Sequence, residues 1–390
     1  MMRLVAGGVA CLVLGVLACG GQASDEDGPD EGSGGDADPG TGGNDHNSGG
    51  ANNDASGGRQ GSGGEAENSG GSGSGGEPDG GSGGDSQLTE CISCEPGYEC
   101  FEAVALDRCF KLCETETPNV ELHTQADVDA LASLECEVIG NDFSLASPDL
   151  NSLVGLEHLR VIKGEFLITG TTTLTSLEGL NGLLYVDDHI SINGNSGLVD
   201  ISALGQMKTA EVNLSFSGNA ALTSLDGLQS VKKVLGFMAT GNPMLSDVSG
   251  FSPESVFENV LYTGNGLIEA VVLPDLVSVG GGVQVSAEQA CTSVQIPALD
   301  YLGTSLLVGG NPELLEINLD SLTRVGSITI ADNPKLITTG GLPLLAEVDE
   351  TISITMNISL PQCEVDAIAA RFSAACTYCT DNDPDGVCTQ

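Results

Sequence analysis

The chain is poor in basic residues, aromatic residues and histidine. Its 390 residues contain 12 Lys and Arg, 55 Asp and Glu, 5 Tyr, 9 Phe, 4 His and no Trp. The formal net charge of −43 excludes nucleic acid and anionic lipid surfaces as partners, because both attract patches of Lys and Arg. The His residues form no HExxH motif, and GxSxG strings occur only within the Gly/Ser-rich residues 20–88. Neither metalloprotease nor serine-hydrolase chemistry is therefore indicated.

Glycoside hydrolysis is the enzymatic alternative that the composition leaves open. Paired carboxylates perform this chemistry, and acidic residues are abundant here. A sugar-cleaving groove also needs exposed aromatic side chains for stacking, and the candidates are Tyr185, Tyr301 and Phe251. Because these are few, we expect a protein that is not an enzyme.

The first 18 residues have the composition of an export signal. Arg3 precedes an apolar run that ends at Ala18 and is too short to cross a bilayer as a stable helix. Residues 16–19, Val-Leu-Ala-Cys, resemble the lipobox of bacterial lipoproteins. This resemblance implies cleavage after Ala18 and a lipid on Cys19, and Gly20 in place of Asp favours the outer membrane or cell surface. The alternative is an ordinary secretory signal that contains a cysteine.

Residues 19–88 follow as a glycine-rich, acidic segment. Residues 20–88 contain 25 Gly, 14 acidic residues, one Arg and no aromatic residue. Such a composition cannot bury enough apolar surface to fold, so we expect a disordered tether that charge repulsion extends. The tether would hold the rest of the chain away from the membrane, with the lipid as its only membrane contact.

The chain contains 13 cysteines, most of them in two groups. Once Cys11 and Cys19 are set aside, six lie near the front of the folded part and four near the end. Export predicts disulfide bonds within each group, and the sequence leaves their connectivity open. Zinc at the two CxxC pairs is the alternative, which export disfavours. The disulfide candidates are Cys91, Cys94, Cys100, Cys109, Cys113, Cys136, Cys363, Cys376, Cys379 and Cys388.

From about residue 160 the sequence repeats itself with a period near 23 residues. The marker of each repeat is a turn position, usually Asn after Gly, and apolar residues recur at −5, −3, +3 and +6 relative to it. The −5 and −3 columns alternate like a strand with one buried face, and such units are stable only when stacked. The markers are Thr171, Asn195, Asn219, Asn242, Asn265, Glu288, Asn311, Asn333 and Asn357.

These columns predict a mainly β protein, a parallel β-solenoid of about nine to ten coils with few helices. Asn in register at successive turns predicts a ladder that satisfies backbone groups of the next coil, and Gly before it tolerates positive φ. Cys291 occupies the +3 column and Cys363 the +6 column. We therefore expect Cys291 to be a buried free thiol that packs as a small hydrophobe, and not a reactive one.

The ends of a solenoid expose apolar surface and need caps. Residues 124–134 are compatible with a helix, and we expect a first strand after it at residues 136–139. At the other end, residues 363–372 predict an amphipathic helix that closes the last coil. The predicted organisation is a Cys-rich segment at 89–120, the solenoid at 121–375 and a Cys- and Asp-rich tail at 376–390.

Two segments carry a family resemblance. Residues 192–198, Ile-Asn-Gly-Asn-Ser-Gly-Leu, and residues 216–228 resemble the receptor L domain, which includes ligand-binding lobes of insulin- and EGF-type receptors and many bacterial lipoproteins. The resemblance covers about residues 125–375 and implies a right-handed β-helix related to leucine-rich repeats. This sequence departs from the family pattern at residues 287–291, where the Gly-Asn turn is replaced. Because the family binds varied ligands through different surfaces, no binding residue carries over.

The C-terminal residues 380–388 contain the pattern DxDxDG. Asp381, Asp383 and Asp385, with Gly386, are spaced like the oxygen ligands of EF-hand and thrombospondin type 3 calcium loops. The bidentate Glu of a calcium loop is missing, so any calcium would be weakly bound. The alternative is an acidic turn beside a disulfide, and no other cofactor is expected.

These features together predict a monomeric, lipid-anchored recognition or adhesion protein at the bacterial outer membrane or cell surface. Its partner would be a protein or a glycan bound by the solenoid. The alternatives are a polysaccharide-acting enzyme on a β-helix scaffold and a passive structural protein of the envelope.

Overall fold

The computed structural model describes residues 94–100, 108–115, 119–208, 212–372 and 376–388. The predicted signal at residues 1–18, the lipidated Cys19, the tether at 19–88 and Cys91 all lie outside these residues. The elements described below belong to one compact unit, Gly83–Gln390.

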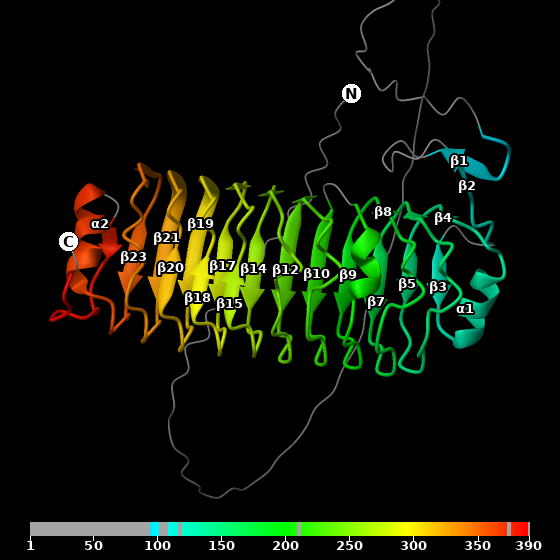
Figure 1. The fold of residues 1–390 in the computed structure, drawn as a ribbon, viewed down its shortest axis with the longest axis horizontal. Helices are drawn as coiled ribbons and strands as arrows, with labels where there is room; N and C mark the ends of the chain where they lie inside the picture. The colour runs from blue at the N-terminus through cyan, green and yellow to red at the C-terminus, as the bar shows by residue number, and fades with distance from the viewer. Residues whose placement is uncertain (1–93, 101–107, 116–118, 209–211, 373–375, 389–390) are drawn as a thin grey trace, which may run out of the picture. The chain divides into compact units, whose positions relative to one another are not determined.

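The described residues form a parallel β-solenoid, as predicted (Figure 1). Each coil contributes one strand to a main row in which neighbouring strands are parallel. There are about 11 turns, more than the nine or ten expected, because two coils precede the first marker. The main row consists of β3 (Val120–Leu122), β5 (Phe143–Leu145), β7 (Phe166–Thr169), β9 (Ile190–Asn193), β10 (Asn213–Ser217), β12 (Gly236–Thr240), β14 (Val260–Thr263), β17 (Val283–Ser286), β19 (Tyr301–Gly309), β21 (Arg324–Ala331), β23 (Ile352–Thr355) and β24 (Cys376–Tyr378).

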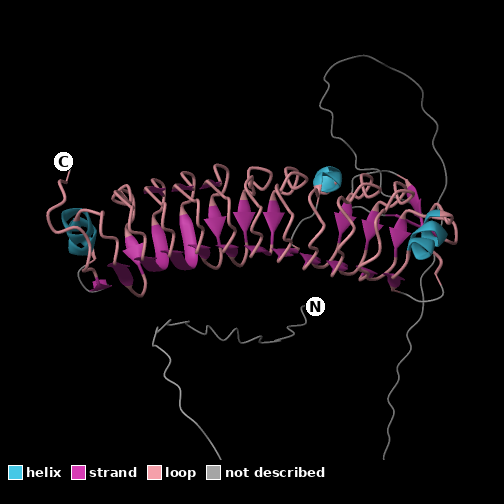
Figure 2. Cartoon of the chain, turned by 90° about the horizontal axis from the view of Figure 1, so that it is seen from below, coloured by secondary structure: helices cyan, strands magenta, loops and turns pink. Residues whose placement is uncertain are grey.

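Shorter strands form further parallel rows on the other sides of the coils (Figure 2). The long strands β19 and β21 connect the main row to one of these rows, so that 16 strands form a single sheet. One coil also contains a 3₁₀-helix, η2 (Ser202–Gln206), at positions where its neighbours have turns. The short strands are β11 (Lys233–Val234), β13 (Ser255–Val256), β16 (Ser278–Val279) and β22 (Glu347–Val348) in the joined row, β15 (Ala270–Val272), β18 (Ser293–Gln295) and β20 (Glu316–Asn318) in a second, and β4 (Val138–Ile139), β6 (Val161–Ile162) and β8 (Tyr185–Val186) in a third.

The apolar columns form one continuous core. Strand register places each residue of a column opposite its equivalent in the next coil, as in the succession Phe166, Ile190 and Leu214 at −5. All residues of the −5, −3 and +3 columns are buried. Phe251 is buried too, and its ring stacks on Phe237 with centroids 3.9 Å apart. The expectation that Phe251 is an exposed aromatic was therefore wrong.

The marker residues form the predicted ladder, and all nine are buried. Asn195 shows the pattern: its Oδ1 accepts from the backbone N–H of Thr171 (3.1 Å), and its Nδ2 donates to the backbone oxygen of Ile168 (2.9 Å). Nδ2 also lies 3.1 Å from Oδ1 of Asn219, one coil further on. The residue before each marker has φ between 56° and 70°, so Gly is the usual residue there.

Glu288 takes the marker position in the coil that departs from the pattern. Its carboxylate accepts from the backbone N–H (3.1 Å) and Nδ2 (2.9 Å) of Asn265, which continues the ladder on one side. Asn265 itself donates Nδ2 to the backbone oxygen of Ala239. The equivalent acceptor for Glu288 is the backbone oxygen of Tyr262, and a carboxylate has no N–H to donate to it. Burial raises the pKa of Glu288 to about 7, against the hydrogen bonds from Asn265 that lower it.

The N-terminal end differs from the prediction in the order of its elements. Helix α1 (Gln125–Ala132) forms as expected, with Thr124 and Asp127 in a capping box. The first strand of the main row is β3, which precedes this helix. The strand expected at residues 136–139 is the short β4, which belongs to another sheet. Before the solenoid, β1 (Tyr98–Cys100) and β2 (Cys109–Lys111) pair as an antiparallel ribbon.

At the C-terminal end, helix α2 (Gln362–Arg371) closes the stack as predicted (Figure 1). Cys363, expected in the buried +6 column, is instead exposed on this helix. Beyond α2 the chain returns to the ladder, where Oδ1 of Asn382 accepts from the backbone N–H of Asn357 (3.3 Å). Residues 376–388 are thus a last partial coil and not a separate tail.

Disulfide bonds join cysteines within each of the two predicted groups. Cys113–Cys136 connects the Cys-rich segment to the first coil, and Cys363–Cys388 connects α2 to the last partial coil. Zinc at the CxxC pairs was the wrong alternative, because their described thiols are in disulfides. The other described bonds are Cys94–Cys109 and Cys376–Cys379, and Cys100 is also disulfide-bonded.

Candidate functional site

The outer face of the main row carries an open hollow of about 430 Å³ across β9, β10, β12 and β14. Side chains on this face alternate with the buried −5 and −3 columns, so they occupy positions −6, −4 and −2. Ser191 and Ser215 are short and Gly236 has no side chain, whereas Met238 and Leu261 are larger. The hollow is therefore a local dip in a regular sheet surface. The other residues that line it include His189, Asn213, Glu258 and Asn259.

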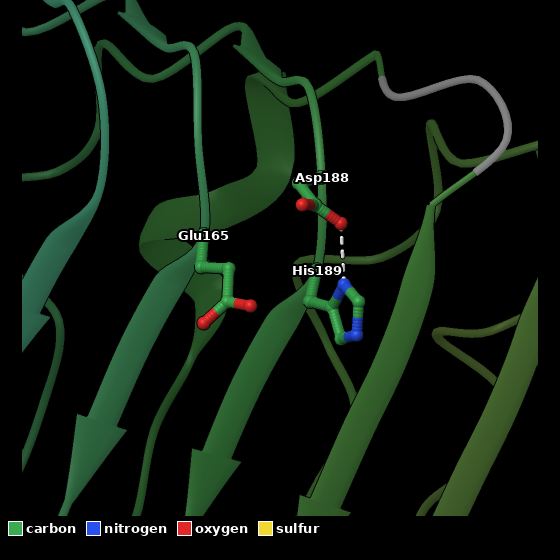
Figure 3. A group of neighbouring side chains, drawn as sticks. All are labelled: Glu165, Asp188 and His189. Carbon is green, nitrogen blue, oxygen red and sulfur yellow. Dashed lines mark hydrogen bonds and ion pairs between the residues drawn. The ribbon is translucent and has the colours of Figure 1, made fainter. Parts of the chain in front are cut away.

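His189 also belongs to a cluster with Glu165 and Asp188 (Figure 3). Phe166 pairs with Ile190 across the parallel strands β7 and β9, so the residues directly before them, Glu165 and His189, occupy one column in adjacent coils. Asp188 precedes His189, and its carboxylate is hydrogen-bonded to Nδ1 of the imidazole. Strand pairing therefore brings the three side chains together.

The cluster offers a nitrogen and two carboxylate oxygens within 4.8 Å of one another. All three residues are exposed, and the side chains of Asp188 and His189 keep 55% and 54% of their accessible surface. No described residue forms a hydrogen bond to the Glu165 carboxylate. Two carboxylates this close repel each other unless a cation lies between or beside them. A protonated imidazole or a metal ion can supply that positive charge.

The three aspartates predicted to bind calcium lie in the turn of the last partial coil. Asp381 adopts the positive φ of 64° that precedes the buried Asn382. The Asp383 backbone N–H donates to the backbone oxygen of Leu360 (2.8 Å). The Asp383 carboxylate accepts from the backbone N–H of Asp385 (3.0 Å). Within the described ranges, the three aspartates form no group of converging ligand atoms like that at Glu165. Calcium binding here stays a prediction, and the structure gives this segment a role in the ladder.

Cys291 is a free thiol within the core. Its Sγ lies 3.3 Å from the backbone oxygen of Ser293. Burial raises the pKa of the thiol to about 11, which keeps it protonated at neutral pH. The other aromatic candidates differ in environment: Tyr185 is half-buried and bonds Asp187 through its hydroxyl (3.0 Å), and Tyr301 is exposed on β19.

Sequence reasoning did not group Glu165, Asp188 and His189. The His residues form no local sequence motif that would point to such a group. The signal that finds the group is the repeat itself, because Glu165 and His189 both stand six residues before a marker. Aligning the −6 column, as the apolar columns were aligned, would have placed the two side by side.

Comparisons with protein-family models, with curated proteins and with solved structures found no match for this chain. Within the described part of the chain, no helix has the length and hydrophobicity that crossing a membrane requires. Function is therefore inferred from the fold and the site geometry.

Proposed function

We propose that the protein is a lipid-anchored surface protein that recognises another protein or a glycan through the hollow on the main row, without catalysis. The observation that carries this proposal is the hollow itself. Its volume of about 430 Å³ is in the range of ligand sites, and it lies open on an otherwise regular sheet face.

The chemistry of the hollow suits a ligand with both polar and apolar faces. Ser191, Ser215 and Asn259 supply hydroxyl and amide groups, while Met238 and Leu261 supply apolar contact. A sugar ring or a peptide segment has this combination of surfaces. The strands below are held on both sides by parallel neighbours, so the site is formed before the ligand arrives and little ordering entropy is lost on binding.

The proposed location follows from the N-terminal sequence. The resemblance of residues 16–19 to a lipobox supports a lipid on Cys19, and the acidic, Gly-rich residues 19–88 support a tether to the outer membrane or cell surface. The resemblance of residues 125–375 to the receptor L domain supports recognition as the role of the solenoid. A tethered, monomeric solenoid would present the hollow to molecules outside the cell.

The test compares ligand binding by two variants. One has a bulky side chain in the hollow, and the other has the same side chain at an equivalent position outside it. Ser215→Arg places a long side chain in the hollow, and Ser353→Arg places the same one in the same column on β23, away from it. The purified full chain is screened on glycan and cell-envelope protein arrays, and hits are titrated. We expect Ser215→Arg to weaken binding at least about tenfold, since displacing contacts worth about 1.4 kcal/mol has that effect, and Ser353→Arg to leave it unchanged.

Three outcomes would contradict the proposal. Absence of any specific binding would favour a passive envelope protein. Equal binding by the two variants would place recognition elsewhere on the solenoid. Cleavage of a polysaccharide by the wild-type chain would favour the enzyme alternative.

A further inference from the structure

We propose that Glu165, Asp188 and His189 bind a divalent transition-metal ion, zinc being the ion that fits best, at the edge of the hollow. This site goes beyond the proposed recognition of a protein or glycan and does not depend on it.

The ligand atoms are positioned by the sheet. Neighbouring parallel strands lie about 4.8 Å apart, so equivalent side chains in adjacent coils start at a spacing that a metal ion can bridge. Glu165 and His189 are such a pair, and Asp188 adds a third ligand from the residue next to His189. One nitrogen and two oxygens then lie within 4.8 Å of one another, on a framework that parallel hydrogen bonds hold rigid.

Other acidic groups near the cluster already have partners. Asp142, the −6 equivalent in the preceding coil, accepts from the backbone N–H of Glu165 (3.0 Å). Asp187 accepts from the Tyr185 hydroxyl (3.0 Å). The Glu165 and Asp188 carboxylates are the ones that converge on the imidazole, and their mutual repulsion would be relieved by a dication.

The ligand set selects the kind of metal. Calcium and magnesium prefer oxygen ligands alone, whereas imidazole suits zinc, copper and nickel. Zinc accepts His nitrogen and carboxylate oxygen together, and three protein ligands leave a coordination position open to water or to a ligand. Because His189 also lines the hollow, that position would be available to an oxygen of a bound glycan or protein. The metal would thereby place positive charge on a strongly acidic surface.

The experiment measures zinc binding directly. The full chain is treated with a chelator, dialysed and titrated with zinc chloride by isothermal calorimetry. We expect one site of unit stoichiometry that is lost, or weakened at least about tenfold, in His189→Ala, and weakened also in Glu165→Gln and Asp188→Asn. Because all three side chains are exposed, thermal unfolding of these variants should match the wild type.

The matched control is His123→Ala. His123 is an exposed histidine paired with one carboxylate, that of Glu121 at 3.5 Å, and among the described residues no third ligand joins this pair. The control should retain the zinc site at full affinity. Zinc binding that survives His189→Ala, a loss of equal size in His123→Ala, or no binding at 100-fold excess of zinc over the chain would each overturn the inference. These results are independent of the array screen, so the metal site and the proposed recognition can fail separately.

Discussion

A single residue type, asparagine, provides the polar interior of the solenoid. Each marker Asn accepts from a backbone N–H and donates to at least one backbone carbonyl, so it satisfies groups that burial would otherwise leave unpaired. The ionised Glu288 side chain can only accept hydrogen bonds, and it cannot donate one to a backbone carbonyl. A protonated carboxyl has an O–H that can donate, as the Nδ2 group of each marker Asn does. The position therefore favours the neutral form of Glu288, in agreement with its raised pKa.

Replacing Glu288 with Gln should stabilise the protein at alkaline pH. The pKa of Glu288 is about 7 in the folded chain and 4.5 as its ordinary value. A pKa that is raised on folding contributes stability that is complete below pH 4.5 and is lost as the pH rises through 7. Glu288→Gln remains neutral, so its advantage over the wild type should grow by about 2–3 kcal/mol between pH 4.5 and pH 8. Urea unfolding at both pH values measures it.

The comparison between the two proteins removes the effect of the other carboxylates, which titrate in both. A difference in unfolding free energy that is the same at pH 4.5 and pH 8 would show that folding does not raise the pKa of Glu288. Glu288→Asn, which restores the residue of the neighbouring coils, should show the same pH dependence as Glu288→Gln.

Residues inside the repeat were predictable because one geometry recurs at each coil. The burial of Cys291 follows from its column, and the buried Asn ladder follows from the period. Phe251 and Cys363 were not predicted correctly. Phe251 stands nine residues after its marker, like the buried Leu180, Leu204 and Leu228, so aligning this column would have predicted its burial. Phe251 stacks on Phe237, and Cys363 falls where the coil gives way to helix α2.

At the scale of elements, the two helices cover the ends of the core. Helix α2 is held to the preceding coil by Arg371, whose guanidinium donates to the backbone oxygens of Gly341 (3.1 Å), Leu342 (2.9 Å) and Leu345. These carbonyls lie between β21 and β22, in the coil that contains the Asn333 marker. One side chain therefore fixes the position of the helix against the stack.

Truncating Arg371 to Ala should loosen this cap. Hydrogen bonds from a charged donor contribute about 1.5–3 kcal/mol, so we expect Arg371→Ala to lower the unfolding free energy by about 2 kcal/mol. Hydrogen exchange should show the loss of protection first in α2 and only later in β12 and β14. The control is Arg324→Ala, which removes exposed ion pairs to Asp349 (3.1 Å) and Glu347 (3.6 Å) and should change little. Equal effects of the two substitutions would show that α2 is not held by Arg371.

The elements at the ends were less predictable than those in the middle. The helix at residues 363–372 was found from its amphipathic pattern. The strand β3 was missed because the coils before the first marker lack the Asn signal. The last partial coil was taken for a tail because its ladder residue, Asn382, lies within an acidic run that has the spacing of a calcium loop.

At the scale of the whole molecule, the fold follows from stacking. No coil can bury its own apolar face, and each coil contacts only its neighbours, so the core is continuous from β3 to β24. The same stacking aligns surface columns, which is how Glu165 and His189 become neighbours. The repeat in the sequence therefore predicts the core and, once outward columns are aligned, the proximity of Glu165 and His189. The hollow could not be predicted, because it depends on the sizes of side chains from four coils at once.

The folded part of the chain has a large excess of acidic residues, and this predicts how the protein responds to salt. Residues 89–390 contain 41 acidic and 10 basic residues. Adjacent coils are about 4.8 Å apart, well within the Debye length of about 30 Å at 0.01 M salt and comparable to about 3 Å at 1 M. Folding brings these charges closer together, so screening should favour the folded state.

Raising sodium chloride from 10 mM to 500 mM should increase the unfolding free energy by about 1–2 kcal/mol, or the melting temperature by about 2–6 °C. A calcium or magnesium salt at equal ionic strength separates screening from specific binding of a dication. A melting temperature that is unchanged or lower in sodium chloride would show that repulsion among the acidic residues does not destabilise the folded state.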